Sequence, residues 1–144
     1  MFALKEPLIS WRTIEQAILD LPYDLIDYNI FLTINTNGVL LTSDIISFCR
    51  QYCIDLHISL DGPQDIHDRG RVYRNHLNES SWQKIIDIIY QYPNYDYMSF
   101  MTTLHMQDID RIEEIFNFMS NLPIVKWVYS LNKFDNWDFN LLEK

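Results

Sequence analysis

Two segments that alternate in polarity, each followed by a turn sequence, constrain the fold of this chain most strongly. Residues 29–35 alternate apolar and polar side chains and lead into Asn37-Gly38, a pair that favours tight turns. Residues 54–60 alternate in the same way and lead into Gly62-Pro63. The residues between them, 43–53, have the apolar spacing of an amphipathic helix. A strand, a helix and a second strand in this order predict a right-handed βαβ unit with parallel strands.

The rest of the sequence continues this alternation of helices and strands. A helical pattern from Ser10 to Leu21 precedes the first strand, and a polar loop to about Asn78 is expected after Gly62-Pro63. The further elements are expected, in order, as a helix over 80–90, a strand over 97–104, a helix over 107–119 and a strand over 124–130. Together they predict an α/β fold with a mainly parallel sheet. Because no linker divides the chain, we expect one domain over 1–130 and a tail, 131–144, whose structure the pattern does not predict.

The acidic balance of the chain excludes some classes of partner. The 144 residues carry a formal net charge of -9 at pH 7, and the sequence pI is about 4.7. Nucleic-acid binders need clustered Lys and Arg side chains that displace phosphate counterions, so nucleic acid is not an expected partner. No apolar run reaches the length of a membrane span, and the N-terminus lacks the basic and apolar segments of a signal peptide. We therefore expect no membrane partner and a cytoplasmic location.

The two cysteines of the sequence, Cys49 and Cys53, lie four residues apart in the predicted helix over 43–53. This spacing places both thiols on one helix face. A CxxxCxxC motif would need a third cysteine at the position of Leu56, and closed zinc and iron-sulfur sites take more ligands than two thiols. We interpret both cysteines as buried packing residues, with a metal or redox role as the alternative.

Polar side chains gather where the predicted strands end. In parallel α/β sheets the ligand site lies beyond the carboxyl ends of the strands, where loops converge. Turns in any protein also favour Asn, Asp and Gly, so these residue types alone do not decide between a site and a set of turns. The residues concerned are Asn35, Thr36, Asn37, Ser59, Asp61, Thr103, His105 and Ser130.

Three motifs occur together in the first half of the chain. They are Thr36-Asn37-Gly38, the segment from Ser59 to Pro63 that reads SLDGP, and the segment from His67 to Arg71 that reads HDRGR. Their order and spacing resemble those of radical S-adenosylmethionine (radical SAM) enzymes of the peptide- and sulfatase-maturing, SPASM-type group, in which TNG, SLDGP and HDxxR follow one another. The joint occurrence of all three motifs favours a functional interpretation over a set of ordinary turns.

The resemblance implies a fold, two cofactors and a set of site residues. The fold would be a partial (βα)6 barrel, of which this radical SAM-like core over 1–130 would supply about four βα units. S-adenosylmethionine would lie across the strand ends, where it would bind a [4Fe-4S] cluster held by a CxxxCxxC loop. No such loop occurs in the sequence, so the cluster ligands that the family uses are absent from it. The positions implied to bind S-adenosylmethionine are Glu6, Asn35, Asn37, Ser59 and Arg71.

The role that the resemblance implies differs from residue to residue. Glu6 matches the acidic residue of a GGEP motif that holds the methionine amino group, although Leu4 and Lys5 replace both glycines. Asn35 and Asn37 belong to the TNG segment, which approaches the ligand. Ser59 is placed to bond the carboxylate or the ribose, and Arg71 to form a charge-assisted pair with the carboxylate. No residue is assigned a catalytic or metal-binding role.

Ordinary structural roles explain several of these residues as well. Glu6 can be a charge that precedes a helix, and Arg71 can neutralise Asp65 or Asp68 on an exposed loop. Asp61 is expected to order its turn rather than to touch a ligand. His57, on the polar side of its strand, is interpreted as a hydrogen-bonded core residue. A metal pair at His67-Asp68 is not expected, because neighbouring residues seldom converge on one ion.

Three hypotheses of function remain open. In the first, the chain is a fragment or split part of a radical SAM enzyme that matures peptides or proteins; it would be inactive alone and would need an N-terminal polypeptide that carries CxxxCxxC. In the second, it is a pseudoenzyme that binds S-adenosylmethionine or a peptide without redox chemistry. In the third, it is an α/β protein-interaction domain whose turns mimic the motifs. The sequence predicts neither the substrate nor the oligomeric state.

Overall fold

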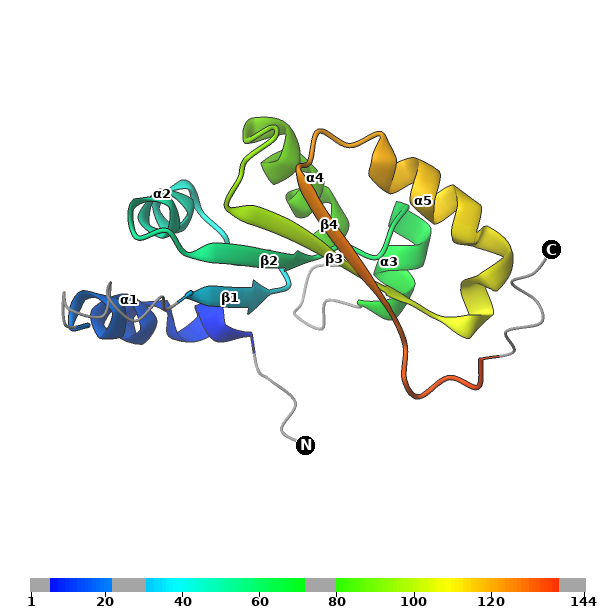
Figure 1. Cartoon of the computed structure of the whole chain (residues 1–144), viewed down its shortest axis with the longest axis horizontal. Coiled ribbons are helices and arrows are strands. Elements are labelled where there is room, and N and C mark those ends of the chain that lie inside the picture. The colour runs from blue at the N-terminus through cyan, green and yellow to red at the C-terminus, as the bar shows by residue number, and fades with distance from the viewer. Residues whose placement is uncertain (1–5, 22–30, 72–79, 138–144) are drawn as a thin grey trace.

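The structure is a computed structural model that describes residues 6–21, 31–71 and 80–137. Four parallel strands form one sheet, in which they follow one another in the order of the sequence (Figure 1). The parallel α/β fold predicted from the sequence is therefore confirmed. The strands are β1 (Thr33–Thr36), β2 (Asp55–Ser59), β3 (Met98–Leu104) and β4 (Lys126–Leu131).

Helices connect the strands and precede the first of them. Thr42 caps the helix after β1, where its hydroxyl accepts a hydrogen bond from Ile45 N at 3.3 Å, which confirms the expected start of that helix. The α-helices are α1 (Trp11–Leu19), α2 (Ser43–Gln51), α3 (Gln64–Gly70), α4 (Ser81–Gln91) and α5 (Ile112–Ser120), and the 3-10 helices are η1 (Pro7–Ser10) and η3 (Met106–Arg111).

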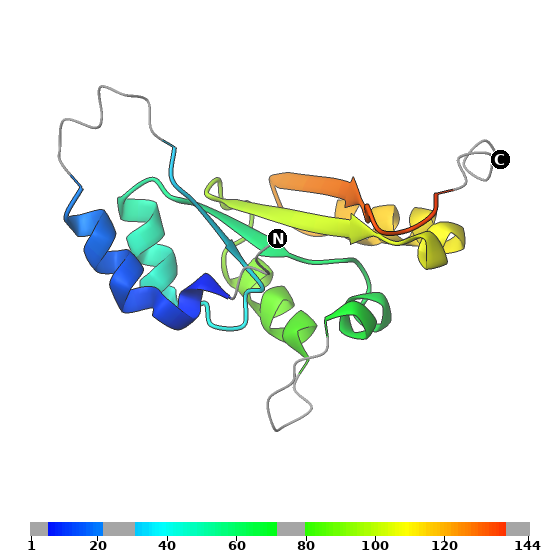
Figure 2. The ribbon, with the colours of Figure 1, turned by 90° about the horizontal axis from the view of Figure 1, so that it is seen from below.

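The connecting helices cover one face of the sheet. Figure 2 shows α2, α3 and α4 on the same side of the strands. On that side Phe116 of α5 packs its ring against Trp127 and Tyr129 of β4, with ring centroids 4.8 and 5.1 Å apart. Right-handed crossovers between strands in sequential order place every helix on the same face. This is the arrangement of a partial βα barrel, whereas a doubly wound sheet has helices on both faces.

The hydrophobic core lies between these helices and the covered face. Alternate strand residues such as Leu56, Ile58 and Phe100 point into it, together with Ile85 and Ile89 of α4. All five side chains are buried. Burial of this kind stabilises a fold by about 1.5 to 3 kcal/mol for each large apolar side chain, so the core holds the strand ends in fixed positions.

The other face of the sheet, which we call the open face, carries polar side chains. An ion pair crosses this face at the amino ends of the strands, where Lys126 Nζ of β4 lies 3.6 Å from Asp55 Oδ1 of β2. The strand between them, β3, contributes Ser99, which is buried. The residues of the open face are Thr33 and Asn35 of β1, Asp55, His57 and Ser59 of β2, Ser99, Met101 and Thr103 of β3, and Lys126, Val128 and Ser130 of β4.

The structure corrects three expectations from the sequence. The segment expected as a polar loop after Pro63 contains helix α3, which is too short for an apolar repeat and is held by the burial of Ile66 and His67. The helix expected over 107–119 is the 3-10 helix η3 followed by α5. The strand β4 extends to Leu131, one residue into the expected tail.

Some expectations lie outside the described residues. These include the start of the first predicted strand at 29–30 and the end of the tail at 138–144. Within the residues that the structure describes, no helix has the length and apolar character needed to cross a membrane.

Candidate functional site

The carboxyl ends of the strands bring the three sequence motifs together at one edge of the sheet. TNG follows β1, SLDGP follows β2, and HDxxR lies in α3, directly after SLDGP. The motifs were predicted to form a ligand site there. The structure separates their side chains into two groups, because some are bonded to one another and others face the open side.

Glu6 is bonded to the TNG turn. Thr36 Oγ1 donates to Glu6 Oε1 at 2.5 Å, and Asn37 N donates to Glu6 Oε2 at 2.8 Å. The turn is closed further by Gly38 N, which donates to Thr36 Oγ1 at 3.0 Å, and by Val39 N, which donates to Asn37 Oδ1 at 3.0 Å. Glu6 therefore fixes the end of β1 through both carboxylate oxygens. The preceding positions, 4 and 5, lie outside the described residues.

The backbone conformation and close packing at Gly38 require the glycine of TNG. Its φ is +79°, a conformation that favours glycine, and a Cβ atom there would lie 2.9 Å from Ile85 Cγ1 and 3.1 Å from Ile58 Cγ2. Any larger residue would push the turn away from the core. The glycine thus brings the end of β1 close to α4.

Asp61 orders the SLDGP turn, as expected. Its Oδ1 accepts hydrogen bonds from Thr103 N at 2.9 Å and Arg71 Nη2 at 3.2 Å, and its Oδ2 accepts one from Arg71 Nε at 2.5 Å. The carboxylate is buried, whereas Arg71 retains partial exposure. The bidentate pair joins the end of α3 to the ends of β2 and β3. Arg71 thus pairs with Asp61, and neither Asp65 nor Asp68 is its partner.

The histidine and aspartate of HDxxR join α3 to the start of α4. Asp61 N donates to His67 Nδ1 at 3.2 Å, so the neutral ring carries its proton on Nε2, which donates to Ser81 Oγ at 2.8 Å. Burial lowers the pKa of His67 to about 4, so this side chain is neutral at pH 7. Asp68 accepts hydrogen bonds from Ser80 Oγ at 2.8 and 2.7 Å. These two residues are parts of the framework.

Asn35 and Ser59 differ from the motif residues above. Both lie on the open face, Asn35 exposed and Ser59 half-buried. Their side chains form no hydrogen bond with any residue that the structure describes. They are therefore available to a ligand at the carboxyl edge of the sheet, and their ligand role stays a prediction.

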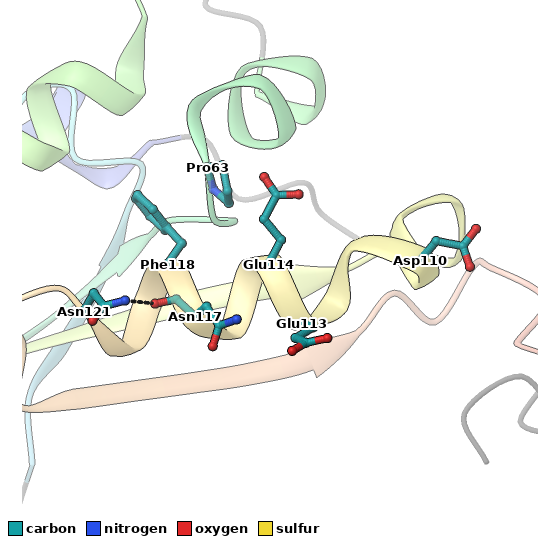
Figure 3. Close-up of a pocket in the computed structure, with 7 residues that line it drawn as sticks. All are labelled: Pro63, Asp110, Glu113, Glu114, Asn117, Phe118 and Asn121. Atoms are coloured by element: carbon teal, nitrogen blue, oxygen red, sulfur yellow. Dashed lines mark hydrogen bonds between the residues drawn. The ribbon is translucent and has the colours of Figure 1, made fainter. Parts of the chain in front are cut away.

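A hollow on the opposite, helix-covered side contains none of the predicted site residues. It has a volume of about 640 Å³ and lies between Pro63 and helix α5. Figure 3 shows Phe118 and Glu114 pointing from α5 toward Pro63. Glu114 is already paired with Arg111, whose Nε lies 2.8 Å from its Oε2. The hollow is thus an outer groove of the helical layer.

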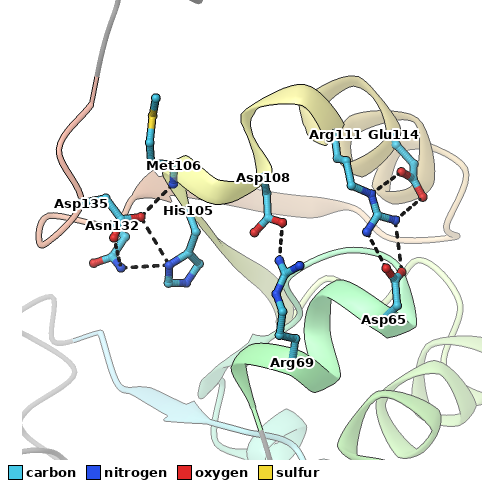
Figure 4. Close-up of polar contacts among 9 residues, drawn as sticks. All are labelled: Asp65, Arg69, His105, Met106, Asp108, Arg111, Glu114, Asn132 and Asp135. Carbon is cyan, nitrogen blue, oxygen red and sulfur yellow. Dashed lines mark hydrogen bonds and ion pairs between the residues drawn. The ribbon is translucent and has the colours of Figure 1, made fainter.

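Three ion pairs lie on that side, and two of them hold α3 against η3 (Figure 4). Arg69 pairs with the buried Asp108, and Arg111 pairs with both Asp65 and Glu114. The hydrogen bond and charge of Arg111 lower the pKa of Asp65 and of Glu114. The two ion pairs between α3 and η3 fix α3, the helix that follows β2.

A polar cluster at the ends of β3 and β4 joins His105, which the sequence placed at a strand end, to Asn132 and Asp135, which the sequence analysis missed. His105 Nδ1 lies 2.9 Å from Asn132 Nδ2 and 3.5 Å from Asp135 Oδ2, and Asp135 Oδ2 also accepts a hydrogen bond from Met106 N at 2.8 Å (Figure 4). Asn132 and Asp135, three residues apart, have the composition of a turn, which is the signal that the sequence offered. The cluster folds the start of the tail back onto η3.

Comparison with known proteins identifies the fold. No family model matches the chain. Two curated relatives do: the radical SAM cyclopropyl synthase TigE of Paramaledivibacter caminithermalis, 29% identical over 142 residues, and the cysteine-type anaerobic sulfatase-maturating enzyme of Clostridium novyi, 28% identical over 130 residues. The alignments cover 94% and 78% of this chain but only 28% and 34% of those proteins. The chain thus spans about a third of the length of these relatives.

Solved structures of the enzyme anSMEcpe have the same fold. The structure with bound AdoMet (S-adenosylmethionine) and the Kp18Cys peptide matches 88% of this chain and 36% of its own length, with a TM-score of 0.66 and 14% identity. The native structure with bound AdoMet alone matches equally well. The fold of this chain is that of a partial radical SAM core. The resemblance found in the three motifs is confirmed, because one curated relative of the chain is named as a radical SAM enzyme and the other as an anaerobic sulfatase-maturating enzyme.

The two cysteines of this chain do not fit an iron-sulfur cluster. Cys49 is buried in α2 under the covered face, and burial raises the pKa of its thiol to about 11, so it remains protonated. Cys53 lies after the end of α2 with a φ of 52° and is exposed, so the prediction of a buried packing residue is wrong for this cysteine. Tyr97 Oη donates to its Sγ at 3.6 Å. Both cysteines lie at the end of the sheet opposite the motifs. Among the described residues, no group of three or more His, Cys, Asp or Glu side chains could hold a metal ion.

The open face carries polar groups of the kind that bond a polar organic ligand. It offers an amide and a hydroxyl from Asn35 and Ser59 next to the fixed turns at the strand ends. Of the other residues that the resemblance implied, Glu6 and Arg71 are engaged within the protein, and the Asn37 side chain accepts from Val39 N. In this structure these three residues shape the edge of the site.

Proposed function

We propose that this chain is the S-adenosylmethionine-binding part of a radical SAM enzyme that modifies a peptide or protein. The observation that carries the proposal is the open face of a one-sided parallel sheet, with polar groups at its carboxyl edge, in a fold shared with AdoMet-bound structures. The relative from Clostridium novyi is named for the maturation of a sulfatase, and one anSMEcpe structure contains a peptide. These names support a peptide or protein as the substrate.

In this proposal the residues of the chain bind and orient the ligand. Ser59 and Asn35 donate hydrogen bonds to the polar groups of S-adenosylmethionine, while Glu6 and the Asp61–Arg71 pair keep the two turns in place. S-adenosylmethionine supplies the 5'-deoxyadenosyl group on which radical SAM enzymes depend. No redox step is assigned to the chain, because its two cysteines cannot hold the cluster.

The cluster ligands would then come from a polypeptide that carries CxxxCxxC, either joined to this chain or separate from it. The strand β1 forms an edge of the described sheet, and an edge strand presents backbone groups that can pair with a further strand. An added strand at β1 would bring the cluster loop next to Asn35. The cytoplasmic location predicted from the sequence accompanies this proposal.

Ligand binding can be tested with the purified chain. Titration calorimetry with S-adenosylmethionine should detect binding, and Ser59→Ala and Asn35→Ala should each weaken it by about two- to tenfold, the value of one hydrogen bond. Ser47→Ala, an exposed serine on α2, is the matched control and should bind like the original chain. Absence of binding at millimolar ligand would contradict the proposal.

The need for a partner can be tested by co-expression. The chain should acquire the brown colour and visible absorption of an iron-sulfur cluster only together with a polypeptide that carries CxxxCxxC. Removal of the three cysteines from that polypeptide is the control. A cluster on this chain alone, or no association of the two, would argue against the split arrangement.

A further inference from the structure

The two edges of the sheet differ in what they expose. β1, one edge strand, has four residues, and its exposed side chains are the polar Thr33 and Asn35. β4, the other edge strand, has six residues, of which five are exposed. Val128 and Tyr129 are each 54% exposed and Leu131 is 40% exposed, and they lie on both faces of the strand because strand side chains alternate. β4 is thus an apolar edge, whereas β1 is a polar one.

The backbone of β4 also has groups that face away from the sheet. Asn132 N donates to Leu104 O of β3 at 2.8 Å, so the backbone groups of every second residue before Asn132 face β3 as well. The N–H and C=O groups of Trp127, Tyr129 and Leu131 therefore face outward. Among the residues that the structure describes, no strand lies beyond them (Figure 1). This edge can accept a further strand along most of its length.

β4 lacks the features that keep edge strands from pairing with other chains. Natural edge strands are short or bulged, or they carry proline and charged side chains, lysine above all. β4 keeps an unbroken register with β3 up to Leu131 and contains no proline. Its one charged residue, Lys126, stands at the first position of the strand and is paired with Asp55 of β2. The middle and the end of β4 are therefore open to association.

The sequence of β4 is complementary to itself. A two-fold axis perpendicular to the sheet at Val128 would align two copies of β4 antiparallel, with both open faces on the same side. Trp127 of each copy would lie opposite Tyr129 of the other, and Lys126 would lie opposite Ser130. The outward backbone groups of Trp127 and Tyr129 fall at the hydrogen-bonded positions of such a pair. Aromatic cross-strand pairs stabilise a sheet, and this register places no two like charges of β4 opposite each other, although the chain has a net charge of -9.

The aromatic side chains at this edge are already held in place. Phe116 of α5 packs on Trp127 and Tyr129, and the rings of the latter two lie 5.8 Å apart. Trp127 Nε1 donates to Thr102 Oγ1 at 2.8 Å. Because these contacts restrict both side chains before association, pairing would cost little side-chain freedom.

We propose that β4 is a self-association surface, at which two copies of this chain pair antiparallel and join their four-stranded sheets into one. The surface lies at the edge opposite β1, where the proposed function places the polypeptide that carries CxxxCxxC. One copy of the chain can therefore use both edges at once. The pairing does not depend on the binding of S-adenosylmethionine.

Sedimentation equilibrium of the purified chain tests the inference. The mass should rise with concentration toward twice the 17.4 kDa of one chain and no further, because a two-fold contact is closed. Val128→Lys places two lysines opposite each other at the axis and removes an apolar contact, so it should weaken association at least about tenfold, as should Val128→Glu. Thr33→Lys, which adds the same charge to an exposed position of the other edge strand, is the matched control and should associate like the original chain.

Two further measurements locate the contact. An equimolar mixture of Val128→Lys and Val128→Glu should form the dimer again, because opposite charges then meet at the axis. In hydrogen exchange, the amides of Trp127 and Tyr129 should be protected in the original chain and should exchange faster in Val128→Lys. The amide of Ser130, which faces β3, should stay protected in both.

Each outcome supports or overturns the pairing at β4. A single-chain mass at every concentration overturns it, and so does growth beyond two chains, which would indicate that β4 pairs with β1 of another copy. Loss of association in Thr33→Lys, or a mixture of the two Val128 variants that stays at the mass of one chain, overturns it as well. Circular dichroism verifies that each variant is folded, and recovery of the dimer on mixing shows the same independently.

Discussion

The two faces of the sheet use their polar residues in opposite ways. On the covered side and at the turns, the motif residues Glu6, Asp61, His67 and Arg71 bond to one another or to the backbone. On the open face, Asn35, His57 and Ser59 have no hydrogen-bonding partner among the described residues. A motif can therefore be diagnostic of a fold because it builds the framework, while the residues that meet a ligand are those left without partners. Substitutions on the two faces should have different effects, and the predictions below compare them.

The largest effect is expected from the buried carboxylate of the framework. Asp61→Asn should lower the free energy of unfolding by about 2 to 4 kcal/mol, because it removes the charge that two Arg71 hydrogen bonds require at a buried position. Urea unfolding measures the change. Asp96→Asn, at an exposed position before β3, is the control and should change stability by less than about 0.5 kcal/mol.

A double-mutant cycle extends this prediction. Asp61→Asn combined with Arg71→Gln should cost less than the sum of the two single substitutions, by at least about 1 kcal/mol. Additive losses would show that the two side chains do not interact in solution. In that case Arg71 would be available to a ligand carboxylate, as the sequence predicted.

The second prediction concerns the pH dependence of stability. Burial lowers the pKa of His67 to about 4 in the folded state, whereas an unfolded chain has the ordinary histidine value of about 6.5. The unfolded state therefore binds more protons between these two pKa values. The contribution of neutral His67 to the stability of the fold is complete above about pH 6.5 and is lost as the pH falls toward about 4. Between about pH 7 and about pH 5 the free energy of unfolding should fall by about 2 kcal/mol.

The contribution of His67 can be separated from that of other groups. His67→Gln should flatten the pH dependence of the free energy of unfolding over this range. Arg111 lowers the pKa values of Asp65 and Glu114, so these carboxylates affect stability only at lower pH. An equally steep loss in His67→Gln would show that His67 is not a buried neutral group.

Glu6 lies at the boundary between the two faces and should show an intermediate effect. Glu6→Gln removes the charge from an acceptor of three hydrogen bonds, from Thr36 Oγ1 at 2.5 Å, Asn37 N at 2.8 Å and Leu8 N at 3.3 Å, and should cost about 1 kcal/mol in urea unfolding. Glu15→Gln on α1 is the control. A loss of S-adenosylmethionine affinity in Glu6→Gln without a loss of stability would instead support the ligand role that the GGEP resemblance implied.

The covered face was easier to predict from the sequence than the open one. Alternation over 54–60 and the turn at Gly62-Pro63 specify a strand and its end, because both depend on neighbouring residues. Helix α3 was missed, since its stability comes from contacts distant in sequence, such as that of His67 Nε2 with Ser81 Oγ at 2.8 Å. Propensity alone does not contain such contacts.

The partners of the motif residues could not be predicted for the same reason. Arg71 was expected near a ligand or near Asp65 or Asp68, but the path of α3 brings it to Asp61. His57 was interpreted as a hydrogen-bonded core residue, but it is half-buried and its ring bonds to no residue that the structure describes. The sequential strand order leaves one face open, and that order is a property of the whole chain.

The smallest effect on stability is expected on the open face, and it completes the comparison. Ser59→Ala and Asn35→Ala should each change the free energy of unfolding by less than about 0.5 kcal/mol, because neither side chain bonds to a described residue. The same variants should weaken the binding of S-adenosylmethionine, whereas the main effect of Asp61→Asn should be a lower free energy of unfolding. A loss of 2 kcal/mol or so in Ser59→Ala would mean that its hydroxyl is part of the framework. Ser59, the residue on which the proposed site most depends, would then stabilise the fold, and the contrast between the two faces would not hold there.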